Sequence, residues 1–263
     1  MQEICERIRD AEFVLVGLGD EFQYDWNALT EDDRYHEIEQ EIGDNQEYVW
    51  IIPFLQKMIL QQSRDDKWSH AYKNLEDMVA GKRYFVISLC MDDYIYDTGL
   101  DEKRIVTPCG GFRKMQCDGN CSHLLSDIPQ ESCNRVFQYY RRELPIGALR
   151  EPVCDRCGSK LRFNQLGVTR YAEEGYLENW TEYTKWLQRT VNRKLCVLEL
   201  GVGMEYPTVI RFPFEKIVTY NQKAFLYRIH SSLYQISEDV GSRGCSIKEN
   251  PVDFLCRYTK YTF

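Results

Sequence analysis

The chain alternates between short apolar runs that end in glycine or polar residues and longer stretches with helical periodicity. The apolar runs cover residues 13–16, 84–89, 104–107, 195–200 and 225–230. Because they lack the alternation of a half-exposed strand, they are typical of strands buried on both faces of a parallel sheet. Helical periodicity is found at residues 4–11, 46–61, 65–80, 176–187 and 207–220. This order predicts an α/β fold, a Rossmann-like doubly wound parallel sheet with helices on both faces.

The first predicted strand runs directly into a loop that contains two glycines, Gly17-Leu18-Gly19. Small residues at the end of a buried parallel strand let backbone N–H groups approach a bound pyrophosphate closely. The pattern therefore indicates a phosphate loop at Gly17 and Gly19. The acidic cluster at residues 31–33 interrupts no periodic stretch, and we expect it to be a solvated loop.

Two cysteine knuckles lie near the middle of the chain, Cys117-Asp-Gly-Asn-Cys121 and Cys154-Asp-Arg-Cys157. Two such pairs at this separation predict a structural zinc site, because each knuckle points both thiolates at one ion and two knuckles complete a tetrahedron. A closed four-sulfur site leaves no position for a reactive water, so it would stabilise a small lobe rather than catalyse a reaction. The alternatives are four unrelated buried thiols or a disulfide pair. His123 is a competing ligand that we expect at the surface.

Composition narrows the choice of partners. Of the 263 residues, 43% are hydrophobic, which is ample for a packed core, and 33 Lys and Arg against 41 Asp and Glu give a net charge of −8. Non-specific binding to nucleic acid or to an anionic membrane needs a basic face, so we expect neither as a partner. The 11 cysteines are odd in number and scattered along the chain, which favours a reducing compartment over a secreted disulfide scaffold.

The amino-terminal residues 1–10 are charged and contain no apolar segment of the kind that signal peptides have. The most apolar run, at residues 48–55, is short and contains Pro53, so we expect no membrane span. These features predict a soluble protein of the cytoplasm.

The sequence resembles the sirtuin family over nearly its whole length. The resemblance rests on the glycine loop after the first strand, on a strand that ends near Asp92, on Cys109-Gly110 directly before the four-cysteine insert, and on Leu198-Glu199-Leu200-Gly201-Val202-Gly203. It implies a Rossmann-like large domain at residues 1–111 and 164–263 and a zinc-ribbon small domain at 112–163. Sirtuins bind NAD and acyl-lysine between two such domains and transfer ADP-ribose to an acyl oxygen or, in some branches, to a protein side chain. The resemblance places Gly17, Gly19, Asp92, Gly201, Val202 and His230 at the cofactor.

Three departures from the sirtuin pattern fall on the groups that bind NAD or act on it. The family motif Gly-Ala-Gly-x-Ser is here Gly17-Leu18-Gly19-Asp20-Glu21, which adds bulk and two negative charges beside an anionic ligand. In the motif Thr-x-Asn-x-Asp the aspartate survives as Asp92, whereas Cys90 replaces the asparagine, and a thiol is a poor substitute for an amide. Cys109 stands where sirtuins have the histidine that serves as general base, and a free thiol titrates about two pKa units higher than imidazole.

Two further residues can each be interpreted in two ways. Cys109 is either a nucleophile whose pKa a neighbour lowers or a small neutral residue that fills the space of the missing imidazole. Glu199 lies inside an apolar strand, where an unpaired carboxylate is costly, so it either pairs with an arginine or faces the ligand site.

The sequence therefore predicts a divergent sirtuin-like protein with structural zinc and a degenerate NAD site, acting as a weakly active or inactive binding or regulatory module. The candidate ligands are NAD or a related nucleotide and an acylated or other protein partner. The alternative is an active NAD-dependent deacylase or ADP-ribosyltransferase that uses substitute groups. A structural protein that binds no nucleotide is a third hypothesis.

Overall fold

The computed structural model describes residues 2–24, 29, 31–43, 45, 47–62, 66–119, 121 and 125–257. The chain forms two compact units, each assembled from separate segments. The first unit comprises Met1–Tyr24, Asp65–Cys109 and Tyr176–Phe263, and the second comprises Asp25–Arg64 and Gly110–Gly175. This division differs from the expected one, because residues 25–64 join the zinc-knuckle segment instead of the parallel sheet. The reason is tertiary packing that local periodicity does not reveal: the ring of Phe54 lies 4.8 Å from that of Phe163.

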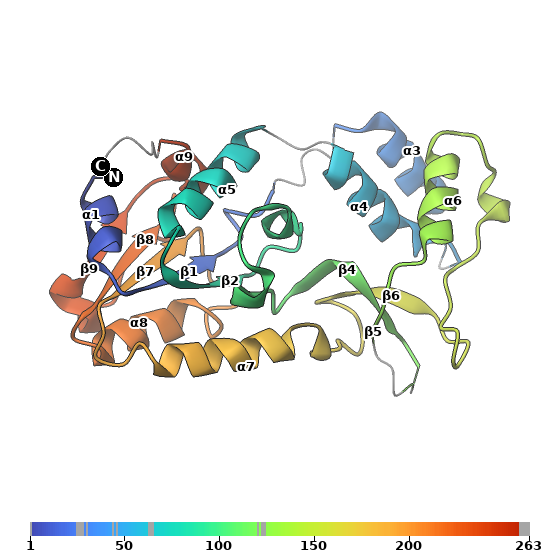
Figure 1. Ribbon diagram of the computed structural model, residues 1–263. Coiled ribbons are helices and arrows are strands. Elements are labelled where there is room, and N and C mark those ends of the chain that lie inside the picture. Colours follow the sequence, from blue (N-terminus) through green and yellow to red (C-terminus); the bar gives the residue numbers. More distant parts are fainter. Residues whose placement is uncertain are drawn as a thin grey trace. The chain divides into compact units, whose positions relative to one another are not determined.

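The first unit is built on a six-stranded sheet in the order β3-β2-β1-β7-β8-β9, and every neighbouring pair of strands is parallel (Figure 1). This confirms the predicted fold class. The strands are β1 (Phe13–Leu18), β2 (Arg83–Ser88), β3 (Ile105–Val106), β7 (Leu195–Leu200), β8 (Ala224–Ile229) and β9 (Gly244–Ile247). All residues of β1 and β7 are buried, as expected of uninterrupted apolar runs at the centre of a sheet.

Helices cover both faces of this sheet (Figure 1). One face carries α7 (Glu174–Gln188), α8 (Arg211–Tyr220) and the 3-10 segment η4 (Glu238–Arg243), and the other carries α1 (Gln2–Asp10), α5 (Asp66–Val79) and α9 (Pro251–Cys256). The core under α7 and α8 joins Leu15 and Val197 of the sheet to Tyr183 and Phe214 of the helices. Two 3-10 segments, η1 (Tyr94–Asp97) and η2 (Glu102–Arg104), connect β2 to β3. Within the described ranges, no helix has both the length and the apolar character needed to cross a membrane.

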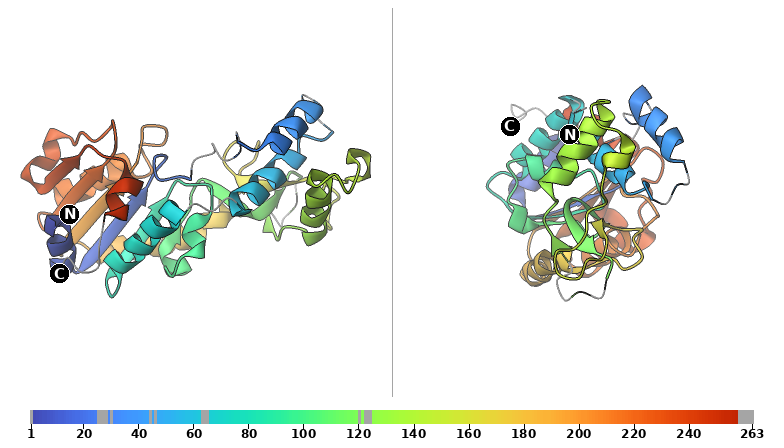
Figure 2. Two further views of the ribbon diagram at one scale, coloured as in Figure 1. Left: turned by 90° about the horizontal axis from the view of Figure 1, so that it is seen from above. Right: turned by 90° about the vertical axis from the view of Figure 1, so that its right-hand side faces the viewer.

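The second unit contains a three-stranded antiparallel sheet in the order β5-β4-β6, formed by β4 (Gly110–Cys117), β5 (Leu125–Ser126) and β6 (Leu161–Gln165). Its helices are α3 (Asp33–Ile42), α4 (Ile51–Gln62) and α6 (Gln130–Tyr140), with the 3-10 segment η3 (Ile146–Ala148) (Figure 2). Asn164 of β6 donates to Gln116 Oε1 at 2.9 Å, and the Gln116 oxygen also accepts from Ala172 N at 3.0 Å. The buried amides thus tie the segment after β6 to β4.

Glu199, left open by the sequence, pairs with an arginine. Its oxygens accept from Arg228 Nε at 2.6 Å and from Arg228 Nη2 at 2.9 Å, and both side chains are buried. Arg211 lies 3.5 Å from the same carboxylate and donates to Val202 O at 2.7 Å. The ion network therefore joins β7 and β8 to the loop that follows β7.

Candidate functional site

The loops after β1 and β7 meet at the carboxyl edge of the parallel sheet, because the two strands are neighbours. Gly19 N donates to Leu200 O at 3.0 Å, and Glu21 N donates to Gly201 O at 3.1 Å. A Cβ atom on Gly19 would lie 2.3 Å from Val202 Cα and 2.4 Å from Gly201 O. Glycine is therefore required here by the contact between two loops, and two of the N–H groups of the expected phosphate loop are already bound to protein carbonyls.

Gly17 lies inside β1, two residues before Gly19. A Cβ atom on it would lie 2.6 Å from Ile210 Cγ2 and 2.8 Å from Phe214 Cε2. Its small size thus serves the packing of β1 against α8.

The carboxylate of Asp20 occupies a backbone donor on the opposite loop. Its Oδ1 accepts from Gly203 N at 2.7 Å, and a Cβ atom built on Gly203 would lie 2.6 Å from the same oxygen. The carboxylate therefore rests in a space that only a glycine leaves open. A bare N–H group beside a glycine is the kind of donor that holds a phosphate oxygen, and here an internal anion uses it.

Glu21 occupies a second set of donors, at the end of β8. Its carboxylate accepts from Ser231 N at 2.8 Å and from the Ser231 hydroxyl. Ser231 was not singled out from the sequence, because nothing in the local pattern at the end of β8 marks it as a partner of a residue that follows β1. Glu21 and Asp20 together place two carboxylates on backbone N–H groups of two different loops.

His230 ends β8 and is buried beside Glu21. Its Nδ1 accepts from Ser232 N and Leu233 N, each at 3.1 Å, which assigns the proton of the neutral ring to Nε2. Nδ1 also lies 3.0 Å from Glu21 Oε2, a distance that becomes a hydrogen bond only when Nδ1 is protonated. Burial lowers the pKa of His230, against the opposing effect of the Glu21 and Asp20 charges. The ring is therefore neutral near pH 7, and within the described part of the chain its buried Nε2 has no hydrogen-bond partner.

Asp92 follows β2 and is buried. Its Oδ2 accepts from Tyr24 N at 2.6 Å and its Oδ1 accepts from Tyr94 N at 2.9 Å. Burial raises the pKa of Asp92 to about 6, although both backbone hydrogen bonds favour the ionised form. Both oxygens thus hold the chain segments that follow β1 and β2, which is a structural use of the residue.

Cys90 lies in the same region, in place of the asparagine of the sirtuin motif. Its thiol donates to Gly19 O at 3.4 Å, and burial, helped by the charge of Asp92, raises its pKa well above the ordinary value. Cys90 is therefore a neutral thiol that packs against the glycine loop. It offers neither the donors nor the acceptors of an amide.

Cys109 ends the segment after β3 and is also buried. Burial raises its pKa to about 12, and the nearby charge of Glu205 acts in the same direction. A reactive cysteine needs a lowered pKa, because the thiolate is the nucleophile. The environment of Cys109 therefore favours the interpretation of a small neutral residue over that of a nucleophile or a general base.

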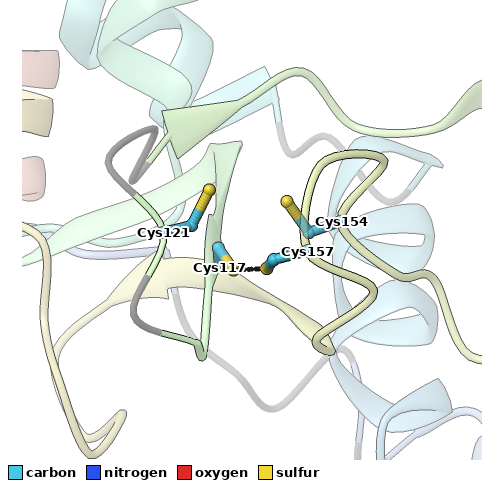
Figure 3. A group of neighbouring side chains, drawn as sticks. All are labelled: Cys117, Cys121, Cys154 and Cys157. Atoms are coloured by element: carbon cyan, nitrogen blue, oxygen red, sulfur yellow. Dashed lines mark hydrogen bonds between the residues drawn. The ribbon is translucent and has the colours of Figure 1, made fainter.

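The four knuckle cysteines form one cluster in the second unit (Figure 3). Cys117 ends β4, and Cys154 and Cys157 lie on the segment before β6, which places the two knuckles side by side. The Sγ atoms of Cys117, Cys121, Cys154 and Cys157 all lie within 4.8 Å of one another, and those of Cys117 and Cys157 are 3.4 Å apart. His123 lies outside the described residues.

The geometry of this cluster fits a zinc ion. Four thiolates at Zn–S distances of about 2.3 Å have S···S separations of about 3.8 Å, close to the spacing found here. All 11 cysteines are free thiols, so the alternative of a disulfide pair does not hold among these four. Four thiolates this close would repel one another without a cation, and the cluster could therefore hold Zn²⁺.

Comparison with known proteins agrees with the sirtuin-like architecture. No protein-family model matches the chain. A Sir2 homologue solved in complex with ADP-ribose has a TM-score of 0.59 with this structure at 14% sequence identity, over 98% of this chain and 95% of that one. A second structure, from a study of sirtuin substrate affinity, has a TM-score of 0.54 at 13% identity, over 98% and 97% of the two chains. The protein thus has the sirtuin fold.

Two curated proteins are similar in sequence. A protein ADP-ribosyltransferase of Staphylococcus aureus is 22% identical over 92% of this chain and 82% of its own length. A probable bifunctional ADP-ribose hydrolase/ADP-ribosyltransferase of Fusarium oxysporum f. sp. cubense is 27% identical, over 52% of this chain and only 24% of that protein. The chain thus has the sirtuin fold and is similar in sequence to two proteins that are named as ADP-ribosyltransferases.

Proposed function

We propose that this chain is a sirtuin-like zinc protein whose nucleotide site is degenerate and that it acts as a binding or regulatory module with little or no NAD turnover. The observation that carries the proposal is the position of the Asp20 carboxylate on Gly203 N, at 2.7 Å. An anionic ligand at this donor would have to displace the carboxylate and would meet its negative charge. Glu21 opposes the ligand in the same way at Ser231.

The groups that would act on NAD support the same proposal. Cys90 and Cys109 are buried thiols with raised pKa values, and both carboxylate oxygens of Asp92 are engaged by backbone N–H groups. None of the three offers a base that is both near its working pKa and free to take a proton. Zinc at the four cysteines would have a structural role, because four protein ligands complete its coordination.

The test is a gain of binding. Asp20→Ser with Glu21→Ser removes both internal anions and frees the two N–H groups. We expect the unaltered protein to bind ADP-ribose with a Kd near or above 1 mM and the double variant to bind at least tenfold more tightly, by isothermal titration calorimetry. The matched control is Glu238→Ser with Asp239→Ser, which removes two adjacent exposed acidic residues from η4. Equal affinity in the two double variants, or tight binding by the unaltered protein, would contradict the proposal.

A second candidate, an NAD-dependent ADP-ribosyltransferase that uses substitute groups, is favoured by the similarity to the S. aureus transferase over 92% of the chain. The assay is release of nicotinamide from NAD in the presence of candidate protein acceptors. Under this alternative, release exceeds that of Cys90→Ala with Cys109→Ala, a double variant that changes little volume. Under the degenerate-site proposal, the two proteins release nicotinamide at the same background rate.

A further inference from the structure

A pocket lies in the first unit, at the amino-terminal ends of β1 and β2, whereas the glycine loops lie at the carboxyl ends. Its volume is about 1040 Å³, at the upper end of the range of small-molecule sites. Its floor is aromatic: the ring of Trp186 lies 5.7 Å from that of Phe13 and 5.8 Å from that of Phe85. We call it the Trp186 pocket.

The wall of the Trp186 pocket is formed by elements that are joined to one another by hydrogen bonds. It is formed by α7, by the starts of β1 and β2 and by η2. Asn179 Nδ2 of α7 donates to Glu102 O at 2.9 Å and to Ile105 O at 2.8 Å, which fixes the helix to η2 and β3. These two hydrogen bonds hold α7 beside η2 and β3, so the backbone on both sides of the pocket is connected.

The charges that line the pocket do not balance. Three cations face carboxylates of the same wall, in the pairs Lys185–Glu182 at 2.7 Å, Arg104–Asp101 at 3.5 Å and Arg193–Glu12 at 3.6 Å. Three others, Arg83, Lys103 and Arg189, have no carboxylate within ion-pair distance among the described residues. Arg83 is placed over the ring of Phe13, and Arg189 influences Glu182 only through its charge. Within the described ranges, one lining carboxylate, that of Glu178, likewise lies outside ion-pair distance of a cation, so three such cations stand against one carboxylate.

The floor of the pocket is aromatic and uncharged, so the charges of the wall determine which ligand it suits. Trp186 Nε1 is buried and has no hydrogen-bond partner in the described part of the chain, but its lack of accessible surface means that a ligand in the pocket does not reach it. The excess of cations calls for an anion with at least two negative charges and several acceptor oxygens.

We propose that the Trp186 pocket binds a small phosphate-bearing molecule with at least two negative charges. The two guanidinium groups suit phosphate because their paired N–H donors match two oxygens at once, and the lysine adds a third charge. The excess positive charge is local, since the chain as a whole carries −8, so the pocket does not reflect a generally basic surface. The site is separate from the degenerate nucleotide site and does not depend on the function proposed for it.

The test uses sodium pyrophosphate as the probe and the zinc-loaded full chain, by isothermal titration calorimetry at two salt concentrations. We expect saturable binding of one pyrophosphate per chain that weakens as salt is raised. Arg83→Ala with Arg189→Ala should weaken it at least tenfold. The matched control Lys216→Ala with Lys248→Ala removes two exposed cations outside the pocket and should change the Kd less than twofold. Because pyrophosphate also binds zinc, the zinc content of the protein is measured after each titration.

Two further arms make the result specific. Trp186→Phe keeps the aromatic floor and removes only a buried indole N–H that a ligand does not reach, so we expect a Kd within twofold of that of the unaltered protein. Citrate, with carboxylates in place of phosphates, should bind at least tenfold more weakly than pyrophosphate. No binding at 10 mM pyrophosphate, or equal affinities in the Arg83/Arg189 variant and the lysine control, would overturn the proposal. Equal affinities for citrate and pyrophosphate would contradict the proposal that the ligand is a phosphate.

Discussion

Asp92 is a buried carboxyl group whose two oxygens both accept backbone hydrogen bonds, from Tyr24 and from Tyr94. Burial outweighs these hydrogen bonds and raises its pKa from 3.8 to about 6. A carboxyl group with a higher pKa in the folded state holds its proton over a pH range in which the unfolded chain has released it. Ionisation of this one residue therefore opposes folding as the pH rises.

The variant Asp92→Asn tests this effect of Asp92 on stability. Between about pH 4 and pH 6 the folded protein binds more protons at Asp92 than the unfolded chain does, so its stability falls as pH rises and then levels off. The difference in pKa corresponds to about 3 kcal/mol, and the variant lacks this contribution. Free energies of unfolding from urea denaturation at pH 4, 5, 6 and 7 should show the unaltered protein losing about that amount relative to the variant. Other titrating groups, zinc ligands included, cancel in the comparison, and parallel pH profiles would refute the prediction.

The residue types at positions 20 and 21 were enough to predict that negative charge gathers at the carboxyl edge of the sheet. Asp20 and Glu21 were expected to oppose an anionic ligand, and the structure places both carboxylates on backbone N–H groups. The specific donors could not be predicted, because Gly203 and Ser231 come from distant parts of the chain. The partner of Glu199 was open for the same reason: Arg228 becomes its neighbour only through the pairing of β7 with β8.

At the scale of elements, the buried strands were predictable because their apolar runs are uninterrupted, whereas shorter or more polar elements were not. The acidic cluster at residues 31–33 was expected to be a loop, yet Asp32 is the N-cap of α3 and its Oδ1 accepts from Tyr35 N at 2.8 Å. Gly43 ends the same helix with a positive φ of 49°. β9 was missed because residues 244–247 contain no apolar run, and it forms only by pairing with β8.

We expect the ion network that joins β7, β8 and α8 to contribute to the stability of the first unit. Arg228 Nη1 donates to Glu215 Oε1 at 2.6 Å as well as bonding Glu199 through its other nitrogens. Glu199→Gln leaves a buried arginine without its main counter-charge, and we expect a loss of about 3 kcal/mol in the free energy of unfolding. Glu199→Leu with Arg228→Leu should lose less than the single change, because no buried charge is left unpaired. Both are measured by urea denaturation.

The control for this prediction is an exposed ion pair on α7. Lys185 and Glu182 lie 2.7 Å apart and are both more than half exposed, so Lys185→Ala should cost at most about 1 kcal/mol. If Glu199→Gln costs no more than Lys185→Ala, the network does not stabilise the sheet in the way proposed. If the double leucine variant is the least stable of all, packing and not charge determines the result.

At the scale of the whole molecule, the chain builds two units with different means of stabilisation. The first unit has a continuous apolar core between its parallel sheet and α7 and α8. The second unit has a three-stranded sheet in which β4 pairs with β5 at two residues and with β6 at four. Its four-cysteine cluster joins the end of β4 to the segment before β6. A small sheet of this kind gains more from a metal than a large core does, because it buries less apolar surface.

This difference leads to a prediction about metal removal. We expect freshly prepared protein to contain one zinc per chain by elemental analysis and Cys154→Ser to contain little. Hydrogen exchange followed by mass spectrometry should then show faster exchange in β4, β5 and β6 of the variant, while β1, β7 and β8 keep their protection because no cysteine of the cluster lies in the first unit. The matched control is Cys133→Ser, which changes a partly buried cysteine of the same unit outside the cluster and should keep both zinc and protection. Zinc-free protein with a fully protected β4 would show that the cluster is not a metal site, and loss of protection in both units would show that they do not unfold separately.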